Sequence, residues 1–227
     1  MFQIEHEVQL SILKQLLLKP KSRFRDLNKT DLTNDHFTFH LKRLIKLGVI
    51  EKKGIHYNLT PQGLEIAGRL DLSNMKIVRS PKVGVCIFTY RKTQGKIEIL
   101  LEERLKDPSK GKMGSHTEKV HFGESIYETA ERCLKDETGL SGKLRYTGVI
   151  RIIRKKKKQP FVDVILNYFK VKNPKGKLIE TTQENKNFWY KYNDALKLKN
   201  TFKYYKEDLK NLLSNKIFIK ERIIDYN

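Results

Sequence analysis

Apolar positions near the start of the chain recur every three or four residues, which is the period of an amphipathic helix. Pro20 ends the first of these runs, because proline cannot continue a helix and restricts the residue before it. Gly48 ends the last run, since glycine favours helix C-termini. The pattern predicts three helices, the second of them capped by Ser22, over residues 8–17, 23–27 and 34–47.

The stretch VIEKKGIHYNLTPQG then changes to strand-like runs. Two short apolar segments, residues 49–50 and 57–59, flank a Lys-Lys-Gly turn at residues 52–54, so we expect a tight hairpin with a positively charged tip. Thr60 and Pro61 open a further helix, because threonine caps a helix and proline is tolerated in its first turn.

The run FTFHLKRLIKLGVIEKKGIHYNLTPQG resembles the recognition helix and wing of bacterial and archaeal winged-helix regulators. The resemblance implies a DNA-binding domain over residues 1–72, because a helix fits the major groove while a basic hairpin lies along the backbone. The outward-facing base-edge or phosphate candidates on its recognition helix are Asn34, Thr38, Lys42 and Arg43. Lys52 and Lys53 are expected to contact phosphates, which position a protein without specifying sequence. The alternative is a unit that serves only for dimerisation or packing.

Beyond residue 72 the pattern is that of an α+β domain with a mixed sheet, which we assign to residues 73–227. The segment DLSNMKIVRSPK loses periodicity and marks the boundary. Strands are expected over VGVCIFTY, KIEILLEER and residues 149–153 and 161–171. Helices are expected over residues 125–138 and 204–213.

The charge of the chain points to a polyanionic partner. Its 227 residues carry a formal net charge of +21, and such a surface attracts nucleic acid. Residues 1–72 hold 12 basic against 8 acidic side chains and the remainder 35 against 18, so most of the excess lies in the second domain. That domain is expected to touch nucleic acid, RNA included, or to bind an anionic small molecule. The run RKKKK at residues 154–158 is most simply an exposed, solvated hairpin loop, and a merely soluble lysine-rich surface is the plain alternative.

The remaining composition bears on the compartment. Cys86 and Cys133 lack the spacing of a zinc site or a disulfide framework. No apolar run reaches the roughly 18 residues needed to span a bilayer, and the N-terminal MFQIEHEVQ is unlike a signal peptide. We therefore expect a cytoplasmic protein without a membrane partner.

The segment GESIYETAERCLKDETGL, residues 123–140, resembles the Nudix box, whose pattern is G-x5-E-x7-R-E-U-x-E-E-x-G-U with U a bulky apolar residue. Aligned on its last glycine, the pattern falls on Glu124, Arg132, Asp136, Glu137 and Gly139. Cys133 stands where a further glutamate is expected. With KVHFGES before it and FWYKYNDALKL after it, the resemblance covers residues 83 to about 200 and implies a Nudix-like fold.

The resemblance also implies metal-dependent chemistry on a nucleotide. Members of the family hold a divalent cation, usually magnesium, against the pyrophosphate of a nucleoside diphosphate derivative, and water attacks phosphorus. If the site is active, its metal ligands are Glu124, Asp136 and Glu137. Cys133 shares a helix face with the last two by its spacing, but magnesium prefers hard oxygen ligands to a thiol. Thr117 and Glu118 also replace the usual pair of glycines in the loop.

The same helix has a purely structural interpretation. Ser125 and Glu128 form an S-x-x-E capping box, and Cys133 belongs to an apolar stripe as a small core side chain. His116 and His121 lack a partner at ligand spacing and are interpreted as loop residues. We therefore expect the fold to be retained, with hydrolysis lost or very weak.

More than one function remains open from the sequence. The leading interpretation is a transcriptional regulator, in which a winged helix binds double-stranded DNA and the Nudix-like domain senses a nucleotide-type ligand or acts as a scaffold. The alternative is a working metal-dependent hydrolase of a nucleoside diphosphate derivative, and an RNA-processing factor is a third. A homodimer is expected, because winged-helix regulators often read two half-sites.

Overall fold

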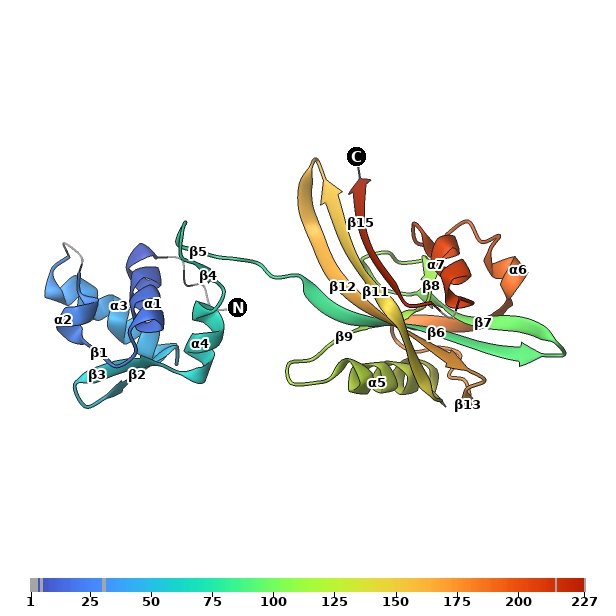
Figure 1. The fold of residues 1–227 in the computed structure, drawn as a ribbon, viewed down its shortest axis with the longest axis horizontal. Coiled ribbons are helices and arrows are strands. Elements are labelled where there is room, and N and C mark those ends of the chain that lie inside the picture. The colour runs from blue at the N-terminus through green and yellow to red at the C-terminus, as the bar shows by residue number, and fades with distance from the viewer. Residues whose placement is uncertain (1–3, 5, 30–31, 215, 227) are drawn as a thin grey trace. The chain divides into compact units, whose positions relative to one another are not determined.

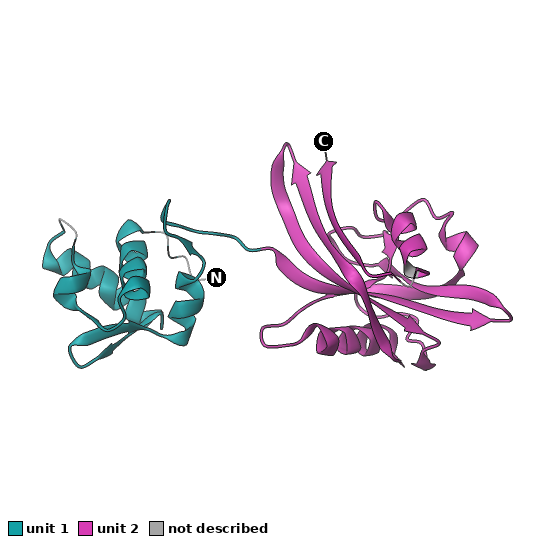
Figure 2. Cartoon of the chain, in the orientation of Figure 1, with its two compact units in different colours: residues 1–80 teal, residues 81–227 magenta. Residues whose placement is uncertain are grey.

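The computed structural model describes residues 4, 6–29, 32–214 and 216–226. The chain divides into two compact units, Met1–Ser80 and Pro81–Asn227 (Figure 2). The division falls at 80/81 and not at 72/73, because a short hairpin of β4 (Leu70–Asp71) and β5 (Lys76–Ile77) belongs to the first unit. Ile77 packs against the core of that unit.

The first unit packs its helices beside a small antiparallel sheet (Figure 1). Its further elements are α1 (Glu7–Leu18), β1 (Ser22–Arg23), α2 (Phe24–Leu27), α3 (Asn34–Lys46), β2 (Ile50–Lys53), β3 (His56–Leu59) and α4 (Pro61–Ala67). The sheet has the order β1-β3-β2. Ser22 differs from the expectation, since it lies in β1 and Arg23 occupies the cap position of α2.

Thr60 and Gly63 fix the joint between the hairpin and α4. Thr60 Oγ1 accepts a hydrogen bond from the N–H of Gly63 at 3.0 Å and donates to the carbonyl of Gly48 at 2.6 Å. A Cβ atom on Gly63 would lie 1.9 Å from the carbonyl oxygen of Val49, so glycine allows the helix to approach the hairpin this closely. The large buried side chains of this unit include Ile12, Leu13, Leu16, Phe37 and Leu44.

The second unit is built on one mixed sheet (Figure 1). Its path runs β14-β7-β6-β12-β11-β15, with β8 paired to β7 and β9 paired to β6. The strands are β6 (Lys82–Thr93), β7 (Lys96–Arg104), β8 (Met113–Gly114), β9 (His116–Lys119), β11 (Leu144–Lys156), β12 (Gln159–Lys172), β14 (Asn185–Lys191) and β15 (Phe218–Tyr226). The β12–β6 and β11–β15 pairs are parallel and the others antiparallel. The sequence had placed a helix last, so β15 is an addition to the expected elements.

Helices pack on both faces of this sheet. Residues of α5 (Ile126–Thr138) share a core with Val85 and Ile87, and residues of α7 (Tyr205–Leu212) share another with Cys86 and Phe88. Successive strand residues point to opposite faces, so β6 contributes to two cores. The short elements are β10 (Leu140–Ser141), β13 (Lys175–Gly176) and α6 (Tyr192–Ala195). In the described residues, no helix is long and apolar enough to cross a membrane.

Candidate functional site

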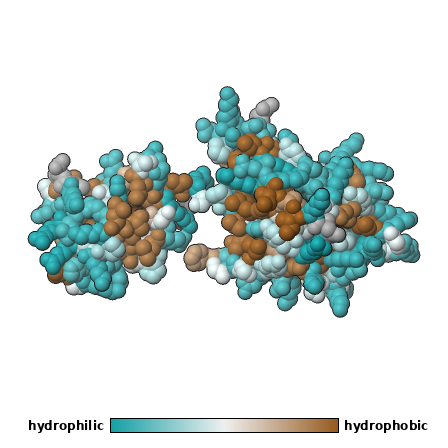
Figure 3. All heavy atoms as spheres, in the orientation of Figure 1, coloured by the Kyte–Doolittle hydropathy of each residue, from teal (hydrophilic) through white to brown (hydrophobic). Residues whose placement is uncertain are grey.

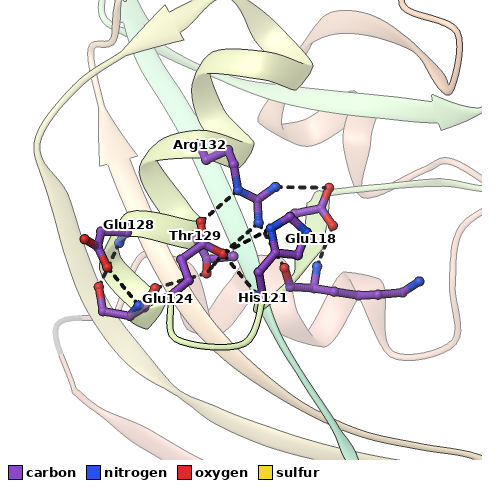
Figure 4. Close-up of polar contacts among 8 residues, drawn as sticks. Glu118, His121, Glu124, Glu128, Thr129 and Arg132 are labelled. Carbon is purple, nitrogen blue, oxygen red and sulfur yellow. Dashed lines mark hydrogen bonds and ion pairs between the residues drawn. The ribbon is translucent and has the colours of Figure 1, made fainter. Parts of the chain in front are cut away.

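Arg132 of α5 binds Glu124, which lies just before the start of that helix. Arg132 donates to both carboxylate oxygens of Glu124, from Nε at 2.8 Å and from Nη2 at 2.9 Å (Figure 4). The backbone N–H of His121 adds a hydrogen bond at 3.1 Å, and Thr129 Oγ1 adds another at 2.8 Å. These donors, Arg132 foremost, hold the pKa of Glu124 well below its usual range.

Arg132 also fastens the loop between β9 and α5. Its Nη2 donates to the carbonyl oxygen of Lys119 at 3.0 Å, and its Nη1 lies 3.8 Å from a carboxylate oxygen of Glu118. The expected capping box closes the same end of the helix. Glu124, expected from the family pattern as a metal ligand, is thus already surrounded by hydrogen-bond donors.

The next positions of the box lie in three different environments. Cys133 is buried in the apolar core, and burial raises the pKa of its thiol. Asp136 is exposed, while Glu137 is half-buried. Successive helix residues are about 100° apart, so Asp136 and Glu137 lie on opposite sides of the direction in which Cys133 points. The three side chains therefore lie on one side of the helix, as their spacing predicts, but they differ in burial.

Glu137 joins a buried polar cluster with β7 and β14. The side-chain amide of Asn185 donates to Glu137 Oε2 at 2.5 Å and to Glu102 Oε2 at 3.1 Å. Burial raises the pKa of Glu102 to about 7 and also raises that of Glu137. Arg104 Nη1 lies 3.7 Å from Glu102 Oε1, which has no hydrogen-bond partner among the described residues. Glu102 and Asn185 belong to no motif in the sequence, and the one signal for Glu102 is an acid inside the apolar run KIEILLEER.

His116 is a buried residue of β9, so its assignment to a loop is wrong. Its Nε2 lies 2.7 Å from Asn187 Oδ1, while Asn187 Nδ2 donates to the carbonyl oxygens of Glu137 and Ile179. Because the amide is oriented by these carbonyls, His116 Nε2 carries the proton and Nδ1 is the acceptor. Burial lowers the pKa of His116, and Nδ1 has no partner in the described part of the chain. His121 is exposed.

These side chains do not fit the magnesium site of the family pattern. Magnesium takes several hard oxygen ligands in octahedral geometry. Among residues 4, 6–29, 32–214 and 216–226, no three His, Cys, Asp or Glu side chains are grouped so that they could hold a metal ion. Glu124 is bound by Arg132 and the thiol of Cys133 is buried. The expected ligand set is therefore not assembled.

A cavity of about 720 Å³ extends from the polar cluster to a group of basic and aromatic side chains. Its lining includes Glu102, Glu137, Arg154, Phe202, Tyr204 and Arg222. Arg222 is neutralised by two hydrogen bonds to Asp208, at 2.9 and 2.7 Å. Arg154 lies over Phe202, with Cζ 5.8 Å from the ring centre, and has no acidic partner in the part of the chain described. The volume suits a small-molecule ligand, and an unpaired guanidinium suits a phosphate.

In the first unit, the candidates on α3 lie along a mostly exposed face. Lys42 and Arg43 are exposed and Thr38 is half-buried. Asn34, at the start of the helix, accepts a hydrogen bond from Asn28 Nδ2 at 3.1 Å. Phe39, which the sequence analysis missed, is 61% exposed. Phe39 precedes Lys42 by three residues and Arg43 by four, so its apolar ring lies beside two cations on the helix surface.

The two candidates on the hairpin have partners within it. Lys53 Nζ forms an ion pair with Glu51 at 2.6 Å, and Lys52 Nζ lies 5.7 Å from the centre of the Tyr57 ring. The exposed ion pair of Lys53 contributes little free energy, so its partner does not prevent this lysine from binding another anion.

Comparison with known proteins identifies the second unit. A family model described as the NUDIX domain matches residues 80–210. The Mutator MutT protein of Bacillus halodurans is similar in structure, with a TM-score of 0.55 and 22% identity over 63% of this chain and 89% of that one. The NUDIX domain of Shewanella oneidensis NrtR, solved with ADP ribose, has a TM-score of 0.52 and 13% identity over 67% and 96%. A search of curated proteins gives no match. The family match covers more than half of the residues of this chain and shows that the chain belongs to the NUDIX family.

Proposed function

We propose that this chain is a DNA-binding transcriptional regulator whose NUDIX domain binds a nucleotide-type ligand and has lost efficient hydrolysis. Support for DNA binding comes from the first unit, where α3 presents exposed basic residues and is followed by the β2–β3 hairpin, in the order of a winged helix. Because such regulators read two half-sites, we expect a homodimer in the cytoplasm.

One observation carries the loss of hydrolysis: Cys133 is buried in the core where the family pattern has a glutamate. Carboxylates position the cation that activates water against phosphorus, and a buried thiol with a raised pKa does not replace one. Glu124 is occupied by Arg132, and Glu137 shares Asn185 with Glu102. The helix therefore keeps its structural role without the full ligand set.

The ligand that we expect is a nucleoside diphosphate derivative such as ADP-ribose. The NUDIX domain of NrtR was solved with ADP ribose, and the cavity of this chain places aromatic rings beside cations. Arg154 is the side chain that we expect to bind a phosphate, because its charge is not compensated and Phe202 lies against its guanidinium.

Calorimetric titration of the full-length protein with ADP-ribose tests this proposal. We expect saturable binding, an affinity at least about tenfold lower in Arg154→Ala because a charge-assisted hydrogen bond is lost, and recovery of intact ligand after incubation with magnesium. Lys92→Ala, at an exposed lysine outside the cavity lining, is the matched control.

The hydrolase remains the second candidate, because Glu102 and Glu137 still line the cavity. Rapid magnesium-dependent turnover of ADP-ribose that Glu137→Gln abolishes would favour the enzyme over the regulator.

DNA binding is tested by fluorescence anisotropy with the full-length protein and duplex DNA. Lys42→Ala/Arg43→Ala should weaken binding more than Lys186→Ala/Lys191→Ala, since cations that contact phosphates release counterions. Equal losses in the two double variants would remove α3 from the interface.

A further inference from the structure

The hairpin of β11 and β12 ends in four consecutive lysines, Lys155, Lys156, Lys157 and Lys158, which are referred to below as the lysine tip. Lys156 pairs with Gln159 in the ladder, so Lys157 and Lys158 form the whole turn. Lys155 is half-buried and the other three lysines are exposed. Within the described residues none of the four takes part in an ion pair.

The backbone of this turn is unfavourable for lysine. Lys157 has a φ of 49° and Lys158 a φ of 65°. Positive φ at both central residues is typical of the type I′ hairpin turn, which strongly prefers Asn-Gly or Asp-Gly because a side chain crowds the backbone there. The β6–β7 hairpin of the same unit makes its turn with Gln94 and Gly95, at φ 50° and 75°. Turn geometry alone therefore does not account for two lysines.

The surroundings of the lysine tip suit an extended polyanion. Lys156 lies opposite Tyr226 in the parallel ladder, so the tip stands beside the C-terminal end of β15 and away from α5 (Figure 1). The end of this hairpin is covered by hydrophilic residues (Figure 3). The cavity lining includes Arg154 but none of the tip lysines. Asp225 is the acid opposite Lys155 in register, and it offsets a small part of the charge.

We propose that the lysine tip is a second DNA contact, which binds the phosphate backbone of a duplex without reading its sequence. Ammonium groups on an exposed turn act as point charges towards phosphates, and such contacts position a protein on DNA. The inference rests on the proposed DNA-binding function and extends the interface to the NUDIX domain. It also gives a role to part of the charge excess that lies outside residues 1–72.

The variant Lys157→Asn/Lys158→Gly separates binding from folding, because it removes two charges and installs the preferred turn sequence. We expect its Tm to rise by about 2–4 °C. The slope of log affinity against log salt, measured by anisotropy on the full-length protein with duplex DNA, should become shallower by about 2. Affinity at about 0.1 M salt should fall about 8-fold for each lost phosphate contact.

The matched control is Lys92→Gln/Lys96→Gln, which removes the same charge from exposed lysines at the end of the β6–β7 hairpin. This control should keep the salt slope of the unaltered protein. An unchanged slope in the tip variant, or an equal change in both variants, would overturn the second contact.

Three further outcomes bear on the second contact and on the proposed function. If Lys42→Ala/Arg43→Ala weakens duplex binding while the tip variant does not, the regulator stands and the second contact fails. If the full-length protein binds no duplex, both fail. A tip variant that loses affinity for an RNA hairpin but keeps it for duplex DNA would also overturn the proposal, in favour of RNA.

Discussion

Glu124 and Glu102 are two glutamates of one domain whose surroundings shift their pKa values in opposite directions. Arg132 donates to both oxygens of Glu124 and lowers its pKa, whereas burial raises the pKa of Glu102 to about 7. Glu124 accepts a hydrogen bond from the loop N–H of His121, while Glu102 lines the cavity with one oxygen that has no hydrogen-bond partner in the described chain. The acid of the family pattern is therefore held by donors from its own loop and helix, and the acid whose pKa is raised to about 7 lies outside the pattern.

Among changes that test the difference between these two glutamates, Cys133→Glu should have the largest effect. It adds an acid close to Glu102 and Glu137. Cys133 is 1% exposed, and burial first, then the charges of Glu118, Glu102 and Glu137, raise the pKa of its thiol, so an added carboxylate would be buried near other acids. We expect a loss of about 3 kcal/mol or more in the free energy of unfolding, measured with urea.

Cys133→Ala is the control for this substitution, and its small cavity should cost about 1 kcal/mol. Unchanged stability of Cys133→Glu together with new magnesium-dependent hydrolysis would show that position 133 opens to the cavity, and that one cysteine had silenced an enzyme.

Glu102→Gln should change the pH dependence of stability by a smaller amount. The folded-state pKa of about 7 lies above the ordinary value of 4.5, so the folded protein binds an extra proton between these two values. The contribution of Glu102 is therefore full below pH 4.5 and is lost as pH rises through about 7. Relative to Glu102→Gln, the unaltered protein should lose about 2–3 kcal/mol between these limits. Parallel stability curves from urea unfolding at several pH values would contradict the assignment.

The smallest effect is expected for Glu124→Gln, with the opposite sign. Since the folded-state pKa of Glu124 is lowered, its contribution is full above the ordinary value of 4.5 and is lost as pH falls towards the folded-state value. At neutral pH we expect a Tm about 5 °C below that of the unaltered protein, and a gap that narrows in acid.

Combining Glu124→Gln with Arg132→Gln should cost less than the sum of the two single changes, because the side chains bond to each other. Additive losses of Tm would mean that Arg132 and Glu124 do not stabilise the domain as a pair.

Features that depend on neighbouring residues were predictable from the sequence. The capping box at Ser125 and Glu128 and the end of α5 at Gly139, with its φ of 72°, follow from short-range preferences. The β2–β3 hairpin and the cap at Thr60 likewise need only residues that lie close together in the chain. The mixed character of the second sheet was also expected.

Features that depend on distant pairing were not predictable. Asn185 reaches Glu102 across 83 residues and Glu137 across 48, because β14 pairs with β7 beside α5. The periodicity of α5 shows which side is apolar, but the packing of the helix on the sheet decides that Cys133 enters the core and Asp136 faces solvent. Residues far apart in sequence define this site, and a pattern within one helix does not contain them.

Because both thiols are buried, their reaction with an added reagent shows when the second unit opens. Cys86 and Cys133 are buried in the second unit with raised pKa values, and the thiolate is the form that reacts with alkylating reagents. Residues 1–80 contain no cysteine, so the rate of labelling measures how often the NUDIX domain alone opens. A molecule that fills the cavity will slow this labelling, which allows ligands to be screened on the intact protein by mass spectrometry without any DNA assay.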